Sequence, residues 1–318
     1  MEEFMKSLLA IIIPCYNAKN TLFTTLSSIS IQENISNFKV YLINDKSDYD
    51  YQEEVTIFQE HFPIEEIQLD KNLGPGGARR EGILKTKEPY IMFIDSDDVL
   101  YDVFSLKNLY ENIKNYDLCI SSFLLERDHV RVIKKYNTIW LHGKIYKREF
   151  LEKYHINFNC TRANEDNGFN RLILLCKPKI HFIDNITYVY KDNKNSITRK
   201  NNRSYKIFGL EGFVDNMIWA LEEALKRGID SSFIPQLVTG VLVSMYYDYL
   251  LYSDLEESIY IIQYSKKIYP YYLKYPKISK NDLENTFKYK EQVFIEENKN
   301  YDKKISFDEF LRKVEDYD

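Results

Sequence analysis

The run Asp95-Ser96-Asp97-Asp98 has the residue types and spacing of a metal site. It directly follows residues 90–94, an apolar stretch that is typical of a buried strand. Carboxylates two positions apart at a strand end can face one cation, and such oxygen ligands suit Mg²⁺ or Mn²⁺ bound to a diphosphate. An isolated D-x-D is more often a solvated acidic turn. The preceding strand is what favours a metal held by Asp97 and Asp95.

A second acidic pair, Glu165 and Asp166, lies at the start of a helix-like stretch. One member of the pair has the chemistry of a general base that takes the proton of an acceptor hydroxyl. An alcohol is a poor nucleophile until that proton is removed, so inverting group transfer needs a base opposite the leaving group. The alternative is that the pair only caps the helix.

Residues 72–82, with the sequence NLGPGGARREG, are rich in glycine and end in two arginines. Gly76 and Gly77 allow a backbone to approach a sugar or diphosphate closely. Arg79 offers a planar fork that matches phosphate or carboxylate. The segment fits neither G-x-x-x-x-G-K-[ST] nor G-x-G-x-x-G, which disfavours an ATPase or a dinucleotide enzyme.

Four more residues are candidates for ligand contacts. Asp45 follows a strand-like segment and has the chemistry to accept hydrogen bonds from a base or ribose. His142 and Lys144 are candidates for contacts with sugar or acceptor, with a packed strand edge as the alternative. Arg199 lies in the basic stretch 191–203, which is either a lid over a diphosphate or a solvated linker.

The segments around these residues alternate between strand and helix patterns over the first hundred residues. Apolar runs predict strands at 9–13, 39–43, 64–69 and 90–94, and helical spacing predicts helices at 21–32, 53–61 and 78–85. The glycines at 74–77 are expected to break the chain before the last of these helices. This order indicates a mainly parallel sheet sandwiched by helices. Ligands in such sheets bind at the carboxyl ends of the strands, where the polar clusters 14–17, 44–47 and 95–98 converge.

The rest of the chain changes from a mixed pattern to helices alone. Strand-like segments occur at 118–125 and 180–184, and a helix is predicted at 165–175. Four further helices are predicted at 205–227, 233–252, 255–269 and 281–297. We therefore predict an α/β domain at residues 1–203 and an all-helical domain at 204–318, the latter for acceptor, partner or homo-oligomer contacts.

Bulk composition narrows the classes of function. The 318 residues include 43 basic and 48 acidic side chains, with a net charge of −5, which disfavours nucleic acid as a partner. Four cysteines without a C-x-x-C pair indicate a reducing compartment. The acidic start interrupted by Pro14 does not fit a signal peptide, and no long clean apolar run predicts a membrane span. We expect a cytoplasmic protein, with a peripheral position at the inner membrane face as an option.

Six segments in a fixed order resemble those of a family 2 glycosyltransferase with the Rossmann-like GT-A fold. The resemblance covers about the first two-thirds of the chain. The segments are IIIPCYNA (11–18), LINDKS (42–47), NLGPGGARREG (72–82), YIMFIDSDD (90–98), GKIYKREFLEKYHINF (143–158) and NEDNGF (164–169).

The resemblance implies a role for each matching residue. It assigns nucleotide binding to Pro14, Tyr16, Asn17, Asp45, Arg79 and Asp95. It assigns the metal to Asp97 with Asp95, and the general base to Asp166, beside Glu165. Three residues differ from those usual in the family: Asn44, Lys46 and Arg80. The identities of the nucleobase and the sugar of the donor are therefore left open.

The resemblance also implies a reaction: inverting, metal-dependent transfer of a sugar, with a UDP-sugar as the expected donor and Mn²⁺ or Mg²⁺ as cofactor. A hexosyltransferase acting on a glycan or wall polymer in cell-surface polymer synthesis fits this class. The Q-x-x-R-W segment of processive synthases is absent, so we expect single transfers. The alternatives are a sugar-phosphate nucleotidyltransferase and an inactive nucleotide-sugar-binding module.

Overall fold

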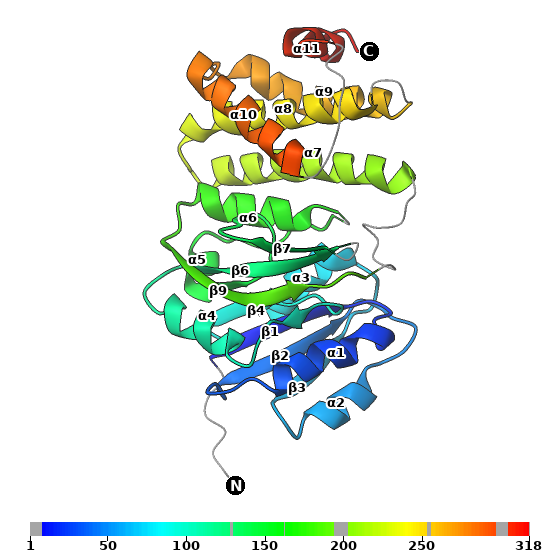
Figure 1. Ribbon diagram of the computed structural model, residues 1–318, viewed down its shortest axis with the longest axis vertical. Helices are drawn as coiled ribbons and strands as arrows, with labels where there is room; N and C mark the ends of the chain where they lie inside the picture. The colour runs from blue at the N-terminus through cyan, green and yellow to red at the C-terminus, as the bar shows by residue number, and fades with distance from the viewer. Residues whose placement is uncertain are drawn as a thin grey trace. The chain divides into compact units, whose positions relative to one another are not determined.

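The computed structural model divides the chain into two compact units, Met1–Lys200 and Asn201–Asp318 (Figure 1). The structure describes residues 8–127, 130–161, 163–193, 203–252, 256–296 and 305–317. The first unit contains strands and helices, and the second contains helices in its described part.

A single mixed sheet forms the centre of the first unit. The strands that the structure describes follow the order β3-β2-β1-β4-β8-β6-β9-β5, with β7 paired to β6. Their bounds are β1 Leu9–Cys15, β2 Phe38–Asn44, β3 Ile64–Gln68, β4 Tyr90–Phe93, β5 Val99–Leu100, β6 Leu118–Arg127, β7 Val130–Lys134, β8 Lys144–Lys147 and β9 Ile180–Tyr190.

The first four strands pair in parallel, as the alternating pattern predicts. β1 lies between β2 and β4, and β3 pairs with β2. The carboxyl ends of these strands therefore meet at one edge of the sheet, so the polar clusters after β1, β2 and β4 come together there. This arrangement confirms the predicted α/β fold class.

The other half of the sheet adds antiparallel pairs. β8 runs antiparallel to β4, with Met92 opposite Ile145. The beginning of β8 thus lies beside the end of β4, which brings the residues before Lys144 to the acidic run. β9 runs parallel to β6 and antiparallel to the short β5, with Val99 opposite Val189. The end of β9 therefore reaches the same edge.

Helices cover both faces of the sheet in the first unit. Leu9, Ile11 and Ile13 of β1 share a buried core with helix α1, while a Cβ on Gly82 of α3 would lie 2.5 Å from Ile12. β1 is thus buried on both faces, which explains its continuous apolar sequence. The helix bounds are α1 Lys19–Ser30, α2 Gln52–Phe58, α3 Gly74–Lys85, α4 Ser105–Ile113, α5 Arg148–Lys153 and α6 Glu165–Leu175.

Helix α3 corrects one sequence prediction. It begins at Gly74, four residues before the predicted start at residue 78. The carboxylate of Asp45 accepts hydrogen bonds from the N–H groups of Leu73 and Gly74, at 2.7 and 2.8 Å. These contacts satisfy the first N–H groups of the helix, and Pro75 favours its first turn. The glycines therefore belong to the helix instead of interrupting the chain before it.

The second unit packs its helices around aromatic side chains. α8 contacts α9 and α10, and Tyr246 packs edge-on against Phe287 and Phe307. None of the described helices is long and apolar enough to cross a membrane. Most apolar side chains of α8, which begins at Ile234, are buried. The bounds are α7 Arg203–Lys226, the 3-10 turn η2 Ser231–Phe233, α8 Ile234–Tyr252, α9 Glu257–Lys274, α10 Lys280–Glu296 and α11 Phe307–Glu315.

Candidate active site

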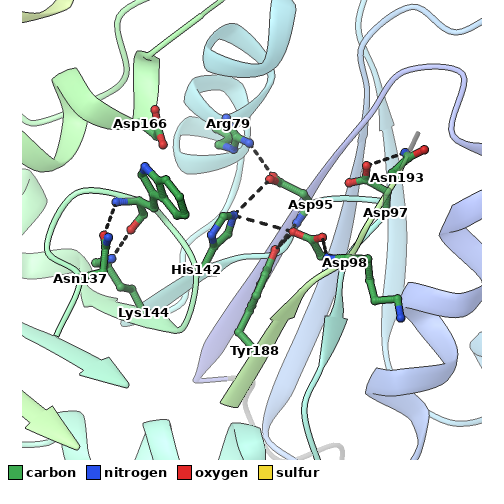
Figure 2. Close-up of polar contacts among 12 residues, drawn as sticks. Arg79, Asp95, Asp97, Asp98, Asn137, His142, Lys144, Asp166, Tyr188 and Asn193 are labelled. Carbon is green, nitrogen blue, oxygen red and sulfur yellow. Dashed lines mark hydrogen bonds and ion pairs between the residues drawn. The ribbon is translucent and has the colours of Figure 1, made fainter. Parts of the chain in front are cut away.

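The acidic run after β4 is held by side chains from α3 and β9 (Figure 2). Asp95 Oδ1 lies 2.5 Å from Arg79 Nη2, and the backbone N–H of Asp95 donates to the hydroxyl of Tyr188 at 3.1 Å. The same hydroxyl donates to Asp98 Oδ2 at 2.7 Å, and Lys191 N donates to Asp98 Oδ1 at 2.8 Å. Two of the three carboxylates therefore have fixed positions at the sheet edge.

His142 faces this run from the segment before β8. Its ring stacks between Tyr188 and Tyr190, with ring centroids 4.9 and 4.7 Å away. Its Nε2 lies 3.9 Å from Asp95 Oδ2 and 3.8 Å from Asp98 Oδ2. Burial lowers the pKa of His142, so the ring is neutral near pH 7 and has a lone pair on one nitrogen.

The donor atoms of this edge suit a divalent cation. One ligand atom each from Asp95, Asp98 and His142 lies within 4.8 Å of the others, and carboxylate with imidazole is a ligand set that fits Mn²⁺. Asp97 lies outside this group, and its Oδ2 accepts a hydrogen bond from Asn193 Nδ2 at 2.7 Å. Burial raises the pKa of Asp97, and the charge of Asp95 raises it further. A cation would relieve this crowding of negative charge.

Arg79 joins the acidic run to helix α6. Its Nη1 lies 2.6 Å from Glu165 Oε1, while its Nη2 contacts Asp95, and the arginine is only 5% exposed. Burial alone would raise the pKa of Asp95, but the Arg79 and His142 side chains hold this pKa well below its usual range. The arginine thus fixes the distance between two acidic clusters that lie 70 residues apart in the sequence.

Asp166 is a half-buried carboxylate in the first turn of α6. Burial raises its pKa to about 7, the neighbouring charge of Glu165 raises it further, and Arg79 opposes both. A carboxylate with a pKa near neutrality is well matched to general-base catalysis. Glu165, in contrast, is buried against Arg79, which indicates a positioning role for that residue.

The predicted nucleotide residues follow the ends of β1 and β2. Tyr16 has 55% of its surface exposed, so its ring is open to stacking with a base. Asn17 has a positive φ of 52° and donates its backbone N–H to Ser47 Oγ at 3.0 Å, which ties the two loops together. Pro14 lies within β1. Asp45 is 3% exposed and holds the start of α3, so its contact with a nucleotide remains a prediction.

Gly76 illustrates how tightly α3 approaches α6. A Cβ at this position would lie 2.5 Å from the Asn159 carbonyl oxygen and 2.9 Å from Glu165 Cβ. A Cβ at Gly77 would lie 2.3 Å from Leu73 Cβ. Close packing therefore explains both glycines, and their contact with a sugar or diphosphate stays a prediction.

We predict that Gly76→Ala destabilises the protein by about 1–3 kcal/mol, because backbone and a buried side chain must move. The free energy of unfolding in urea measures this loss. The matched control is Gly240→Ala in α8, where an added Cβ would have nothing within 4 Å. We expect this control to stabilise the helix by up to about 1 kcal/mol. Equal stability of the two variants would contradict the packing explanation.

The two remaining candidates differ in what the structure shows. Lys144 is fully buried and donates from Nζ to the carbonyl oxygen of Trp140, and burial lowers its pKa to about 7. This position fits the packed strand edge better than a direct sugar contact. Arg199 lies outside the described residues.

Sequence reasoning missed the residues that support the acidic run. Tyr188, Tyr190 and Asn193 come from the end of β9 and the residues after it, nearly a hundred positions from Asp95. Tyr188 and Tyr190 are two positions apart, which indicates that both lie on one face of a strand. The sequence does not specify which strand they would face. The sequence motif contains Asp98, but the motif did not indicate that this side chain is fully buried.

Comparison with known proteins supports this architecture. Residues 10–164 match the model of Glycosyl transferase family 2. Glycosyltransferase GlyA from Streptococcus pneumoniae is 25% identical over 222 residues, which cover 60% of this chain and 31% of that protein. The chain thus spans less than half the length of this curated relative.

Two solved structures share the fold. The structure of S. aureus TarS 1–349 in complex with UDP-GlcNAc has a TM-score of 0.70 and 18% identity, covering 94% of this chain and 93% of that one. The mannosyltransferase PcManGT from Pyrobaculum calidifontis, in complex with GDP-Man and Mn²⁺, has a TM-score of 0.57 and 12% identity, covering 98% and 86%.

The strand order and the likeness to these solved structures together define a GT-A fold. The segment matched by the family model contains the turn after β1, the glycine-rich start of α3 and the acidic run. The match over residues 10–164 confirms the resemblance to glycosyl transferase family 2 that the six sequence motifs predicted.

Proposed function

We propose that the protein transfers a single sugar from a nucleotide-sugar to an acceptor hydroxyl, with inversion, in one displacement. The observation that carries this proposal is the bridge of Arg79 between Asp95 and Glu165, which holds the base-bearing turn of α6 at the acidic edge. Asp166 takes the acceptor proton while the nucleoside diphosphate departs from the opposite face of the sugar.

The metal in this proposal is held by Asp97 and Asp95. Asp98 is fully buried and both of its oxygens accept hydrogen bonds from the protein, so it cannot readily share a cation with a substrate. Asp97 is partly exposed, and a cation that also binds substrate phosphates needs such an accessible ligand. Bound there, Mn²⁺ or Mg²⁺ supplies charge neutralisation for the leaving diphosphate. In this proposal Asp98 and His142 do not bind the metal but hold Asp95 in position.

The donor in this proposal is a UDP-hexose. The exposed ring of Tyr16 offers a surface for the base, in a turn tied to the loop after β2. The fold neighbour TarS was solved with UDP-GlcNAc, and PcManGT with GDP-Man and Mn²⁺, so UDP- and GDP-sugars are the first to test. A glycan or other cell-surface polymer is the proposed acceptor.

The test is release of nucleoside diphosphate from a panel of UDP-, GDP- and TDP-sugars, with Mn²⁺ and with EDTA. We expect slow hydrolysis of one donor, abolished by EDTA and weakened by Asp97→Asn, whose loss of Mn²⁺ affinity is followed separately by calorimetry. Pyrophosphate formation from UTP and a sugar phosphate would instead support a nucleotidyltransferase. Metal-dependent donor binding without any turnover would identify an inactive binding module.

We predict that transfer rises with pH through about 7. Only the carboxylate form of Asp166 accepts a proton, and its raised pKa of about 7 means that this form is lost as the pH falls below that value. The pH profile of kcat/KM measures the apparent pKa. Glu165→Gln removes a charge that raises this pKa, so the rising limb should move to lower pH. A flat profile between pH 5 and about 9 would contradict Asp166 as the base.

A further inference from the structure

The turn after β1 and the loop after β2 are joined by hydrogen bonds that centre on a buried tyrosine. Tyr51, which directly precedes α2, is fully buried, and its hydroxyl accepts a hydrogen bond from the N–H of Ala18 at 3.0 Å. The hydroxyls of Tyr51 and Ser47 lie 3.0 Å apart, and Ser47 Oγ also accepts from the N–H of Asn17 at 3.0 Å. Two side chains of the second loop therefore hold the backbone directly after Tyr16.

Further contacts strengthen this junction on its exposed side. Asn17 Nδ2 donates to Asp48 Oδ2 at 3.2 Å, and the N–H of Asp48 donates to Asn17 Oδ1 at 3.1 Å. The hydroxyl of Tyr49 accepts from the N–H of Lys19 at 2.6 Å. Three consecutive N–H groups, those of residues 17–19, are thus held by hydroxyls of the loop after β2.

The loop after β2 is itself anchored to the neighbouring strand. Glu66 of β3 accepts a hydrogen bond from the N–H of Tyr51 at 3.0 Å and another from Asn44 Nδ2 at 2.7 Å. Asn44 Oδ1 in turn accepts from the N–H of Ser47 at 2.8 Å. Both hydroxyl-bearing residues therefore have their main chains fixed by side chains of β2 and β3.

Helix capping alone does not account for this junction. Capping of α1, which begins at Lys19, would explain the contacts of Lys19 and Ala18, but Asn17 lies outside the helix. Asn17 has a φ of 52°, in the sparsely populated left-handed region, which persists where surrounding contacts fix it. Because Asn17 directly follows Tyr16, the junction sets the direction of a ring that is 55% exposed.

We propose that Tyr51 is a positioning residue for the nucleotide and that, with Ser47, it holds the turn of Tyr16 in the orientation that stacks on the base of the donor. This inference rests on the proposed function, because it takes the nucleotide to lie on Tyr16. Tyr51 does not touch the donor, since it is fully buried. A turn that is fixed before the donor arrives need not be ordered on binding, which raises affinity without changing the chemical step.

The test is the affinity of the full chain for UDP, GDP and TDP with Mn²⁺, measured by calorimetry, together with KM and kcat of donor hydrolysis. Tyr51→Phe keeps the buried ring but removes the acceptor of the Ala18 N–H. We expect about 10-fold weaker binding of the preferred nucleotide, since the backbone of about one residue must then be ordered on binding. KM should rise by the same factor while kcat stays unchanged. Ser47→Ala, which frees the N–H of Asn17, should have a similar effect.

The matched control is Tyr110→Phe, which also removes a hydroxyl that accepts a hydrogen bond. The donor there is Asn37 Nδ2, at 3.1 Å, and Asn37 precedes the start of β2 instead of following its end. We expect this variant to bind nucleotide as the unmodified chain does. Urea unfolding of both tyrosine variants checks that they are folded.

A double-mutant cycle shows whether Tyr51 acts through the turn. Tyr16→Ala should weaken nucleotide binding by about 10-fold or more, through loss of base stacking. Adding Tyr51→Phe to Tyr16→Ala should then weaken binding by less than about 3-fold, because no ring remains to be positioned.

Two results would overturn the positioning role and leave the proposed sugar transfer intact. One is equal nucleotide affinity of Tyr51→Phe and the Tyr110→Phe control, and the other is a full further loss of affinity in the double variant. Weaker binding by Tyr51→Phe, together with no hydrolysis of any donor, would instead support the positioning role and remove the proposed transfer. Failure of the unmodified chain to bind any of the three nucleotides would overturn both.

Discussion

Asp166→Asn is expected to lower sugar transfer by about 10²–10⁴-fold while donor binding stays nearly unchanged. Asparagine keeps the size of the side chain and its hydrogen bond from the N–H of Asn167, at 2.8 Å in the native protein, but it cannot take a proton. Initial rates with the donor found in the panel give the loss of activity. Calorimetric titration of the donor with Mn²⁺ gives its affinity.

The matched control for this prediction is Asp184→Asn. Asp184 is 72% exposed on β9, where it pairs with Lys135, and it has no contact with the acidic edge among the described residues. We expect this variant to keep full activity. Near-full activity of Asp166→Asn would show that another group removes the acceptor proton. Loss of donor binding together with activity would show that Asp166 acts on the donor side.

The parallel half of the sheet was predictable because its information is local. Strands β1 and β4 are continuous apolar runs, and each ends directly in a polar cluster. Parallel strands place such clusters at one edge without any knowledge of side-chain contacts. The acidic run and the turn with Tyr16 followed from this rule and from the motif order.

The antiparallel half could not be predicted in the same way. The pairing of β8 with β4, and of β9 with β6 and β5, joins segments far apart in the sequence, and no local pattern specifies such partners. His142 therefore looked like a candidate for sugar contact, whereas the structure stacks it between Tyr188 and Tyr190 beside the acidic run. The residues that surround His142 depend on which strands pair with β8 and β9.

Local signals also failed where a distant side chain replaces a usual cap. The helix-breaking glycines suggested that α3 would begin at residue 78, but the carboxylate of Asp45 satisfies its first N–H groups. Asn44, which differs from the usual residue of the family, donates to Glu66 at 2.7 Å and accepts from the N–H of Ser47 at 2.8 Å. An aspartate there could not donate to Glu66, so the substitution fits its surroundings.

Arg79→Met is expected to destabilise the protein by about 3–5 kcal/mol, because it leaves Glu165 buried without a counter-ion. Glu165 has 9% of its side chain exposed, so water cannot replace the lost contact, whereas Asp95, at 28%, is partly solvated. Urea unfolding measures the effect. The matched control is Arg80→Met, which removes the neighbouring exposed arginine and should change stability by less than about 0.5 kcal/mol.

A double variant separates the charge bridge from simple loss of packing. In Arg79→Met/Glu165→Gln the buried carboxylate is neutral, so about half or more of the lost stability should return if the unpaired charge is the cause. Activity should not return with it. Glu165→Gln offsets the effect of the lost arginine on the pKa of Asp166, but Asp95 still lacks the Arg79 contact that holds it at the acidic edge. If the double variant unfolds at the same urea concentration as Arg79→Met, the arginine stabilises the fold through packing alone. The acidic edge and α6 are then not coupled by charge.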